Sequence, residues 1–331
     1  MRLLITGGGG FIGRQLTLRL LHDSNLALEG AATETDATET IDEIVLLDTA
    51  PVEALPDDPR LHVVTGDLCD APLIASLTAE ADLIWHLAAV VSSAAEADFD
   101  LGMCVNIDGL RVLLDALRAS ARRPRLVYTS GFAVFGGTLP ECVCDDTAPT
   151  PQSSYGMQKA VGELLVTDYS RRGFIDGRVV RLPTIVVRPG KPNKAASTFV
   201  SSIIREPLAG KPARCPVAAT TQIYMLSPRQ AQAALLRAMC LSSESLGDNR
   251  IIPLPGITLS VGEMVSTLAR VAGAATAELI EWRPDAEIQR IVESWPTQVN
   301  AARARTLGFA PDDSFETIVR AHIEDMTAQS W

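Results

Sequence analysis

Two residues of the sequence have the types and the spacing of an acid–base pair. Tyr155 and Lys159 lie four positions apart in the segment Ser154-Tyr155-Gly156-Met157-Gln158-Lys159, so on a helix they share one face. A phenol with an ordinary pKa of about 10 takes a proton from an alcohol near neutral pH only if its anion is stabilised. A nearby ammonium and a helix N-terminus both stabilise the phenolate, and lowering its pKa by about three units requires roughly 4 kcal/mol. The pair predicts proton abstraction from an alcohol whose carbon loses a hydride.

The helix that must carry this pair has start signals just before it. Thr150, followed by Pro151, or Ser153 can cap the N-terminus, and apolar residues after Ala160 recur at helical spacing. Because Tyr-x-x-x-Lys also arises by chance on amphipathic helices, its meaning depends on what the rest of the chain binds.

The N-terminus carries a glycine-rich turn between a short predicted strand and a predicted helix. Gly7, Gly10 and Gly13 are spaced as G-x-x-G-x-x-G. In a dinucleotide site the first glycine permits a tight turn, the second lets the backbone approach the pyrophosphate, and the third lets helix and strand pack closely. Backbone N–H groups at the start of the helix, at Phe11 and Ile12, would face the diphosphate.

An acidic residue, Asp48, closes the next predicted strand, residues 44–48. Its carboxylate would accept hydrogen bonds from the adenosine ribose hydroxyls and would repel a 2′-phosphate. The residues that follow, Thr49, Ala50 and Pro51, include no cation. The pattern therefore favours NAD over NADP as the cofactor.

Two later strand ends would complete the cofactor site. Asp67 and Leu68 follow a strand predicted at 60–65, where they can accept from the adenine amino group and pack on its ring. Asp67 can also simply cap a helix, and both roles are compatible. The segment Leu87-Ala88-Ala89 ends a strand predicted at 82–87, and its small residues leave room for the diphosphate and the nicotinamide ribose.

Two polar residues beside these strand ends are expected to be buried. Asn106 lies between Val105 and Ile107 in a helix predicted over 98–120, where it could contact the cofactor or hold the active-site strand in place. His86 is expected to be a core histidine with a hydrogen-bond partner rather than a catalytic group.

The order of predicted elements indicates an α/β fold, a doubly wound parallel sheet (Rossmann) with a smaller C-terminal lobe. We expect residues 1–186 to form the NAD-binding domain, with residues 220–255 returning to it. Residues 187–219 and 256–331 are expected to form the smaller substrate-binding lobe. The polar segment 25–42 is expected to be a long surface loop.

Composition excludes several classes of protein. Twenty-nine Lys and Arg against forty Asp and Glu give a net charge of −11, which disfavours nucleic-acid partners. The sequence has no leader pattern and no apolar run of membrane-spanning length, so we expect a cytoplasmic protein with no membrane partner. Its six cysteines lack metal-ligand spacing and its four histidines form no cluster, so we expect reduced thiols and no metal site.

Together, these motifs resemble the extended short-chain dehydrogenase/reductase superfamily, also called the NAD-dependent epimerase/dehydratase family, over the whole chain. Within it, residues 133–137, 150–156 and 181–193 resemble the D-erythronate dehydrogenases. Those enzymes oxidise the C2 hydroxyl of D-erythronate to the 2-oxo acid with NAD. The resemblance therefore implies a sugar-acid dehydrogenase whose cofactor is NAD.

The resemblance also implies roles for particular residues. Tyr155 would be the catalytic base and Lys159 its activator, which also holds the nicotinamide ribose. Pro183 and Thr184 would lie beside the nicotinamide. The candidates for the substrate pocket are Ser92, Arg188, Asn193 and Ser197, of which the arginine suits a carboxylate because it can bind two oxygens at once.

The chain departs from the superfamily at one position. Members usually carry Ser or Thr five residues before the glycine that is here Gly136, and that hydroxyl polarises the substrate oxygen. Counting back gives Gly131, with Ser130 one place earlier. On a strand Ser130 would face the opposite side, although a local bulge could turn it inward. We expect Ser130 or another hydroxyl to take the role.

Two other functions fit the same motifs. A nucleotide-sugar epimerase or dehydratase would hold a nucleotide diphosphate in the smaller lobe and would retain its NAD. A binding protein that senses the redox state of NAD without turnover would explain Gly131, although the intact Tyr155 and Lys159 argue against it. By analogy with the superfamily, we expect a homodimer that pairs through the helix carrying Tyr155.

Overall fold

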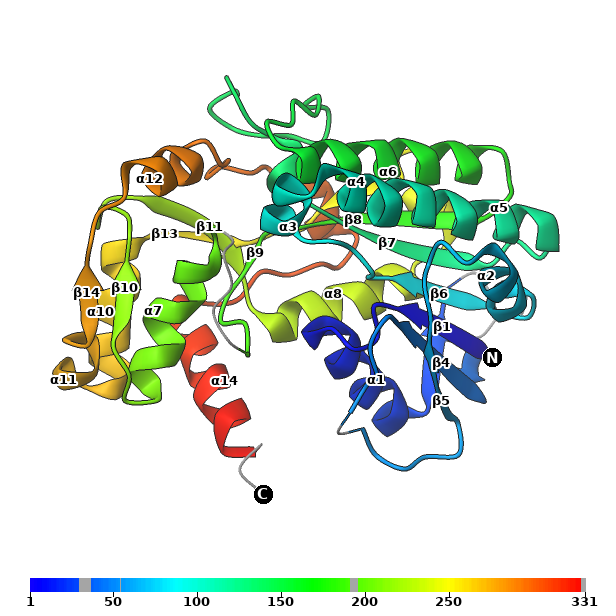
Figure 1. Cartoon of the computed structure of the whole chain (residues 1–331), viewed down its shortest axis with the longest axis horizontal. Helices are drawn as coiled ribbons and strands as arrows, with labels where there is room; N and C mark the ends of the chain where they lie inside the picture. The colour runs from blue at the N-terminus through cyan, green and yellow to red at the C-terminus, as the bar shows by residue number, and fades with distance from the viewer. Residues whose placement is uncertain (30–36, 54, 191–195, 329–331) are drawn as a thin grey trace.

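In the computed structural model, which describes residues 1–29, 37–53, 55–190 and 196–328, seven parallel strands form the central sheet (Figure 1). Their spatial order is β12-β8-β7-β6-β1-β4-β5. The strands are β1 (Arg2–Thr6), β4 (Glu43–Asp48), β5 (Leu61–Thr65), β6 (Leu83–His86), β7 (Arg125–Gly131), β8 (Asp176–Leu182) and β12 (Ile251–Pro253). Central strands such as β1 are almost wholly buried, because helices cover both faces of the sheet. The predicted doubly wound parallel sheet is confirmed.

Helices cover each face of the sheet and enclose a separate apolar core. On one face, α1 (Phe11–Asp23) packs against α8 (Pro228–Cys240), and their leucines and alanines meet residues of β1 and β4. On the other face lie α2 (Ala71–Thr78), α5 (Leu110–Ser120) and α6 (Ser154–Arg171). Burying both faces makes the sheet a rigid frame for residues at its edge.

The strand order of the central sheet reverses at β1, and this reversal determines where a ligand can bind. The strands β4 and β5 extend the sheet on one side of β1, and β6, β7, β8 and β12 extend it on the other. Ligands of such sheets bind beyond the carboxyl ends of the strands, at the point where the strand order reverses. The turn between β1 and α1 lies at that point.

A second lobe packs beside the sheet and has its own apolar core (Figure 1). Among the described residues it contains the sheet β13-β11-β9 and the pair β10-β14. Its strands are β9 (Thr184–Ile185), β10 (Ala213–Cys215), β11 (Gln222–Leu226), β13 (Ile257–Ser260) and β14 (Ile280–Trp282). Its helices are α7 (Thr198–Leu208), α10 (Val261–Ala272), α11 (Ala274–Ala277), α12 (Ala286–Glu293) and α14 (Phe315–Ala328).

The chain crosses between the two lobes more than once. Within the segment 220–255, β11 belongs to the sheet of the second lobe, whereas α8 and β12 pack on and extend the central sheet. Short helices complete the described chain: α3 (Ser92–Ala97), η2 (Phe132–Val134), α9 (Ser243–Leu246) and α13 (Ala302–Thr306). None of the described helices is both long enough and apolar enough to cross a membrane.

One local prediction was wrong, and a second gave the helix correctly but not its π-helical turn. The segment 25–42, predicted as a loop, contains the strands β2 (Asn25–Leu28) and β3 (Ala37–Thr40), which pair antiparallel. The helix predicted over 98–120 is divided into α4 (Phe99–Met103), a π-helical turn η1 (Cys104–Gly109) and α5. Strand pairing depends on a partner segment, and a π turn is set by tertiary contacts, so apolar periodicity alone could not reveal either.

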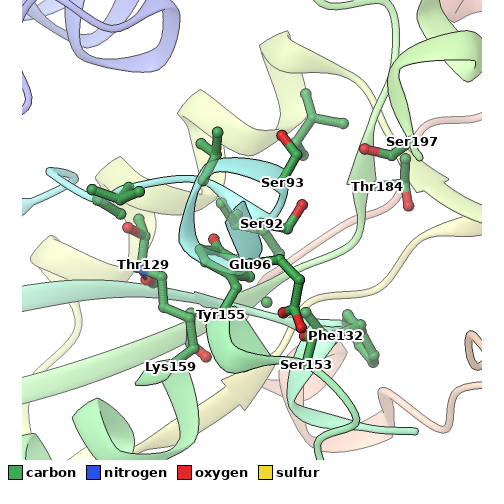
Figure 2. A pocket seen from close by; sticks show the side chains of 18 of the residues that line it. Ser92, Ser93, Glu96, Thr129, Phe132, Ser153, Tyr155, Lys159, Thr184 and Ser197 are labelled. Carbon is green, nitrogen blue, oxygen red and sulfur yellow. Dashed lines mark hydrogen bonds between the residues drawn. The ribbon is translucent and has the colours of Figure 1, made fainter. Parts of the chain in front are cut away.

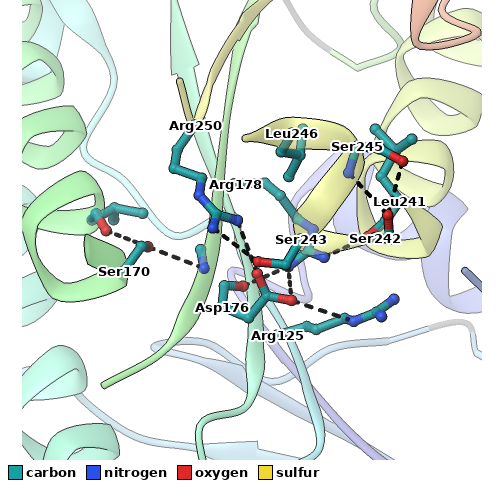
Figure 3. A network of polar contacts seen from close by, with 12 residues as sticks. Arg125, Ser170, Asp176, Arg178, Leu241, Ser242, Ser243, Ser245, Leu246 and Arg250 are labelled. Carbon is teal, nitrogen blue, oxygen red and sulfur yellow. Dashed lines mark hydrogen bonds and ion pairs between the residues drawn. The ribbon is translucent and has the colours of Figure 1, made fainter. Parts of the chain in front are cut away.

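A buried ionic cluster fastens the opposite, amino-terminal end of β8 (Figure 3). The Asp176 carboxylate lies 2.9 Å from Arg178, 3.1 Å from Arg250 and 3.5 Å from Arg125. Arg178 is fully buried and also donates to the carbonyl of Leu241. Burial lowers the pKa of Arg178 to about 10, although Asp176 opposes that shift. The cluster joins α8 and α9 to the sheet far from the strand ends that face the crevice.

The turn after β1 supplies a stability prediction. A Cβ added at Gly13 would lie 2.5 Å from the carbonyl oxygen of Gly7, whereas at Gly10 it would lie 3.3 Å from the same atom. Because backbone cannot move aside as a side chain can, we expect Gly13→Ala to lower the free energy of unfolding by roughly 1–3 kcal/mol. Gly10→Ala, the matched control, should lower it by much less. Urea unfolding of the three proteins tests this, and equal losses in the two variants would contradict it.

Candidate active site

A crevice of about 1640 Å³ opens at the carboxyl ends of the central strands and continues to the second lobe. Its lining includes nearly every residue predicted for the cofactor, the chemistry or the substrate. Those residues are Gly7, Gly10, Phe11, Ile12, Gly13, Asp48, Asp67, Leu68, Leu87, Ala88, Ala89, Ser92, Ser130, Tyr155, Lys159, Pro183, Thr184, Arg188 and Ser197. Asn106 is not among them, and Asn193 lies outside the described residues.

The glycine turn forms a cradle that side chains would fill. Gly7 has a φ of +73°, and a Cβ there would lie 2.6 Å from the backbone nitrogen of Ala88. Gly10 caps α1 without any side-chain hydrogen bond, and Phe11 and Ile12 in the first turn of the helix line the crevice. These are the features that a dinucleotide diphosphate requires, and the residues present therefore fit NAD.

The two carboxylates predicted to bind the adenosine, Asp48 and Asp67, both line the crevice. The N–H of Gly9 donates to Asp48 Oδ2 over 2.9 Å, which fixes the carboxylate beside the glycine turn. The N–H of Cys69 donates to Asp67 Oδ1 over 2.8 Å. Both carboxylates keep acceptor capacity toward the crevice, as ribose and adenine recognition need.

The helix α6 presents Tyr155 to the crevice because two glycines let it lie close to the sheet. A Cβ at Gly156 would lie 2.1 Å from the carbonyl oxygen of Ala133, and one at Gly162 would lie 2.2 Å from the hydroxyl of Tyr128. Ser153 caps the helix by accepting the N–H of Gly156 over 3.1 Å. Tyr155 therefore lies in the first turn, where the partial positive charge of the helix favours a phenolate.

Lys159 lies one turn further along the same face, almost fully buried. Its ammonium donates to the carbonyl of Thr129 over 2.8 Å and lies 5.7 Å from the ring centre of Tyr155. Burial lowers the pKa of Lys159 to about 8, although Glu163 opposes the shift. A lysine in this state can exchange its proton near neutral pH.

The pKa of Tyr155 in this structure differs from the prediction. The phenol was expected to have a lowered pKa, but burial raises the pKa of Tyr155 to about 12, and Arg188 only partly offsets this. The reason is that removal from water disfavours the phenolate more than these cations favour it. The lysine donates to a backbone carbonyl rather than to the phenol.

Ser130 lines the crevice, but its hydroxyl already has a buried partner. Its hydroxyl donates to Glu163 Oε1 over 2.6 Å, and Glu163 pairs with Arg181 over 2.6 Å, all three side chains being almost fully buried. No bulge turns Ser130 inward, because β7 and β8 keep regular register through residues 130 and 131. A Cβ at Gly131 would meet the carbonyl oxygen of Leu182 only at 3.4 Å, so that position has room for the missing hydroxyl.

Asn106 holds the crevice wall rather than lining it. Its amide accepts from the N–H of Val90 over 2.8 Å, donates to the carbonyl of Val90 over 3.0 Å, and donates to Gln158 over 2.7 Å. Of the two roles expected for Asn106, these contacts support the one of holding the wall of the site in place. His86 bonds to Thr6 over 2.7 Å, and burial lowers its pKa to about 3, so it is a neutral core histidine.

The substrate end of the crevice lies between Tyr155 and the second lobe. Figure 2 shows Tyr155 between Lys159 and the α3 residues Ser92 and Glu96, with Thr184 and Ser197 across the pocket. Arg188 donates to the carbonyl and to the hydroxyl of Ser197 over 3.3 and 3.2 Å.

Several lining residues were missed by the sequence analysis. Glu96 accepts from the N–H of Ser154 over 3.0 Å, which anchors the start of α6. Arg290 on α12 and Trp295 just after it also line the crevice. Nothing in their local sequence marks them, because α12 reaches the crevice only through the packing of the second lobe. No group of acidic, histidine or cysteine residues in the described chain has the arrangement of a metal site.

Comparison with known proteins agrees with this geometry. Residues 3–231 match the model of the NAD dependent epimerase/dehydratase family. The chain is 52% identical to a D-erythronate dehydrogenase of Cupriavidus necator over 98% of both chains. It is 43% identical to another of Haemophilus influenzae, over 98% of this chain and 99% of the relative. These matches confirm the resemblance drawn from the motifs.

A solved structure provides a second comparison. The fold matches a protein of Agrobacterium tumefaciens described as a nucleoside-diphosphate-sugar epimerase, with a TM-score of 0.92 and 42% identity. The match covers 100% of this chain and 95% of that one. The relatives therefore carry different activities in their names: two are called dehydrogenases and one is called an epimerase.

The Ser130 contact generates a prediction about its role. Because the hydroxyl satisfies buried Glu163, Ser130→Ala should lower the free energy of unfolding by roughly 1–3 kcal/mol while substrate turnover stays within about threefold. Ser170→Ala is the matched control, since Ser170 is also buried and hydrogen-bonded but lies outside the crevice. Urea unfolding and steady-state kinetics measure both. A hundredfold loss of turnover at unchanged stability, roughly the size expected for a positioned catalytic group, would contradict this role.

The lowered pKa of Lys159 predicts how stability depends on pH. The folded protein has a pKa of about 8 at this residue, against about 10.4 in an unfolded chain. Between these values the unfolded chain binds more protons, so the free energy of unfolding should rise with pH by about 3 kcal/mol through Lys159. Lys159→Met cannot titrate and should lack this increment. Denaturant unfolding of both proteins from about pH 7 to about pH 10 measures the difference, and parallel curves would refute the assignment.

Proposed function

We propose that this chain, which belongs to the NAD dependent epimerase/dehydratase family, oxidises the C2 hydroxyl of D-erythronate, or of a related four-carbon sugar acid, to the 2-oxo acid. The family and the two dehydrogenase relatives identify it as an NAD-dependent dehydrogenase. The observation that carries the proposed substrate is the 52% identity to a D-erythronate dehydrogenase over almost the full length of both chains.

In this proposal Tyr155 accepts the proton of the C2 hydroxyl. NAD, when bound, supplies the hydride acceptor. Because the pKa of Tyr155 is raised to about 12, poising the phenol near pH 7 requires roughly 7 kcal/mol of favourable interaction with the phenolate. Lys159, Arg188 and the N-terminus of α6 are the positive groups available for this. Because the pKa of Lys159 is about 8, its ammonium can also exchange a proton near neutral pH and so pass the proton from Tyr155 to solvent.

Arg188 would bind the carboxylate of the sugar acid. Ser197 holds its guanidinium, and the N–H of Arg188 donates to Ser201 over 3.0 Å, so the side chain is fixed at the crevice. In the described part of the chain no carboxylate forms an ion pair with it, which leaves its charge for a ligand. A carboxylate next to the reacting carbon would then also place C2 near Tyr155, whose pKa Arg188 lowers.

Asp48 would set the preference for NAD. Its carboxylate closes β4 beside the glycine turn, and Thr49, Ala50 and Pro51 offer no cation for a 2′-phosphate. A fixed negative charge at that place repels the additional phosphate of NADP.

A nucleotide-sugar epimerase remains the second candidate. The structural relative from Agrobacterium tumefaciens carries that description. Such an enzyme would return its hydride to the product, so no net NADH would form.

The assay that tests the proposed function follows NADH absorbance at about 340 nm with NAD and a panel of four-carbon sugar acids. We expect D-erythronate to be turned over fastest, a 2-oxo acid to be the product, and NADP to be a poor substitute for NAD. Deuterium at C2 should appear in the reduced cofactor. Nucleotide sugars are incubated in parallel, and an epimerised product without NADH would favour the second candidate instead.

A variant pair checks the catalytic assignment in the same assay. Tyr155→Phe should lower turnover at least a hundredfold, as loss of a general base does, and should leave NAD affinity unchanged. Tyr169→Phe is the matched control, because Tyr169 lies on the same helix but donates its hydroxyl to Asp115, away from the crevice. Normal turnover in Tyr155→Phe would remove this residue from the mechanism.

A further inference from the structure

Two free thiols lie in contact behind the adenosine end of the crevice. Cys69 Sγ and Cys104 Sγ are 3.3 Å apart, and Cys69 Sγ also lies 3.2 Å from the carbonyl oxygen of Cys104. Cys69 follows Leu68 in the turn between β5 and α2, and Cys104 is the first residue of the π-helical turn η1. Residues 35 positions apart in sequence are thus brought together by the fold.

The distance suits formation of a disulfide. The S–S bond length is about 2.05 Å, so the sulfurs need to approach by only about 1.3 Å from their present 3.3 Å separation. Cys69 lies in an irregular turn, and Cys104 is exposed to solvent and therefore accessible to a small oxidant.

The two segments that carry the thiols also form the wall of the NAD site. Asp67 and Leu68 line the crevice immediately before Cys69, and Val105 lines it immediately after Cys104. Leu68 packs on Gly109, where an added Cβ would come within 2.8 Å of it. Movement of either sulfur would therefore shift residues that line the crevice where the adenosine half of NAD would bind.

The movement would also reach the middle of the crevice. Asn106, two residues after Cys104, holds both backbone polar groups of Val90, which itself lines the crevice beside Ala89. Contacts of this kind depend on positions within a fraction of an ångström.

We propose that Cys69 and Cys104 are a redox-sensitive pair whose oxidation to a disulfide weakens binding of NAD. The oxidant is a hydroperoxide. The Cys104 sulfur attacks the peroxide and becomes a sulfenic acid as the O–O bond breaks and water or an alcohol leaves. The Cys69 sulfur then displaces hydroxide from that sulfenic acid, and the thiol proton leaves with it as a second water. Overall two thiols are oxidised and one peroxide is reduced.

The surroundings of the pair set the order of these steps. Burial, together with Cys104 and the carboxylates Asp67 and Asp108, raises the pKa of Cys69 to about 12, so Cys69 stays protonated near neutral pH. Cys104, the more exposed sulfur, is therefore the one that meets the oxidant, and Cys69 resolves it. The step is slow compared with that of dedicated peroxide sensors, since the resolving thiol must lose its proton as it attacks.

The remaining cysteines provide controls. Cys215 is buried, and Cys142 and Cys144 lie outside the crevice lining and on another part of the surface. Cys142→Ser therefore removes an exposed thiol without touching the proposed pair, whereas Cys69→Ser and Cys104→Ser each remove one half of it.

The test treats the full-length protein with hydrogen peroxide, maps its peptides by mass spectrometry and measures NAD affinity by calorimetry without substrate. We expect a peptide pair joined through Cys69 and Cys104, about 2 Da lighter than its two thiol forms, and a several-fold larger Kd for NAD that dithiothreitol restores. Cys142→Ser should behave in the same way, whereas Cys69→Ser and Cys104→Ser should keep the reduced protein's Kd after treatment.

Three outcomes would overturn the inference. They are oxidation of Cys104 to sulfinic acid without a bridge, a bridge that leaves the Kd for NAD unchanged, and an equal loss of affinity in Cys104→Ser. Because the assay contains no sugar acid, its result is independent of the substrate proposed above.

Discussion

The close approach of helix α6 to strand β7 is the constraint on which the rest of the site depends. A Cβ added at Gly156 would lie 2.1 Å from the backbone carbonyl oxygen of Ala133. A Cβ added at Gly162 would lie 2.2 Å from the hydroxyl of Tyr128. Because the helix packs closely on the sheet, three residues spaced four apart on one helix face each contact a different part of the site. Tyr155 reaches the crevice, Lys159 reaches the end of β7, and Glu163 reaches the buried pair with Arg181. Either glycine replaced by a larger residue would move all three together.

Burial shifts the pKa values of Tyr155 and Lys159 in opposite directions, and both shifts work against ionisation. It raises the pKa of Tyr155 to about 12 and lowers that of Lys159 to about 8. The fold offsets this cost with charges that are themselves fixed: Glu163 supports the ammonium, and Arg188 supports the phenolate. At neutral pH the phenolate of Tyr155 therefore lies roughly 7 kcal/mol above the phenol, and positive charge placed near the oxygen is what lowers this difference.

The crevice belongs to both lobes, and each lobe contributes a different function. The rigid central sheet supplies the glycine cradle and the two carboxylates that fit NAD. The second lobe has its own core and brings Arg188, Ser197 and the α12 segment to the open side.

The sequence by itself determined the parts of the site that depend on local chemistry. The spacing of Gly7, Gly10 and Gly13, the acid that closes β4, and the i, i+4 relation of Tyr155 and Lys159 are all set within short segments, so they were predictable. Only the tertiary structure decided what depends on contacts between distant segments. In the folded molecule Ser130 is hydrogen-bonded to Glu163, and Asn106 is hydrogen-bonded to the backbone of Val90. The pKa of the Tyr155 phenol is raised rather than lowered. Side-chain partners and desolvation are properties of the packed molecule, and no local pattern encodes them.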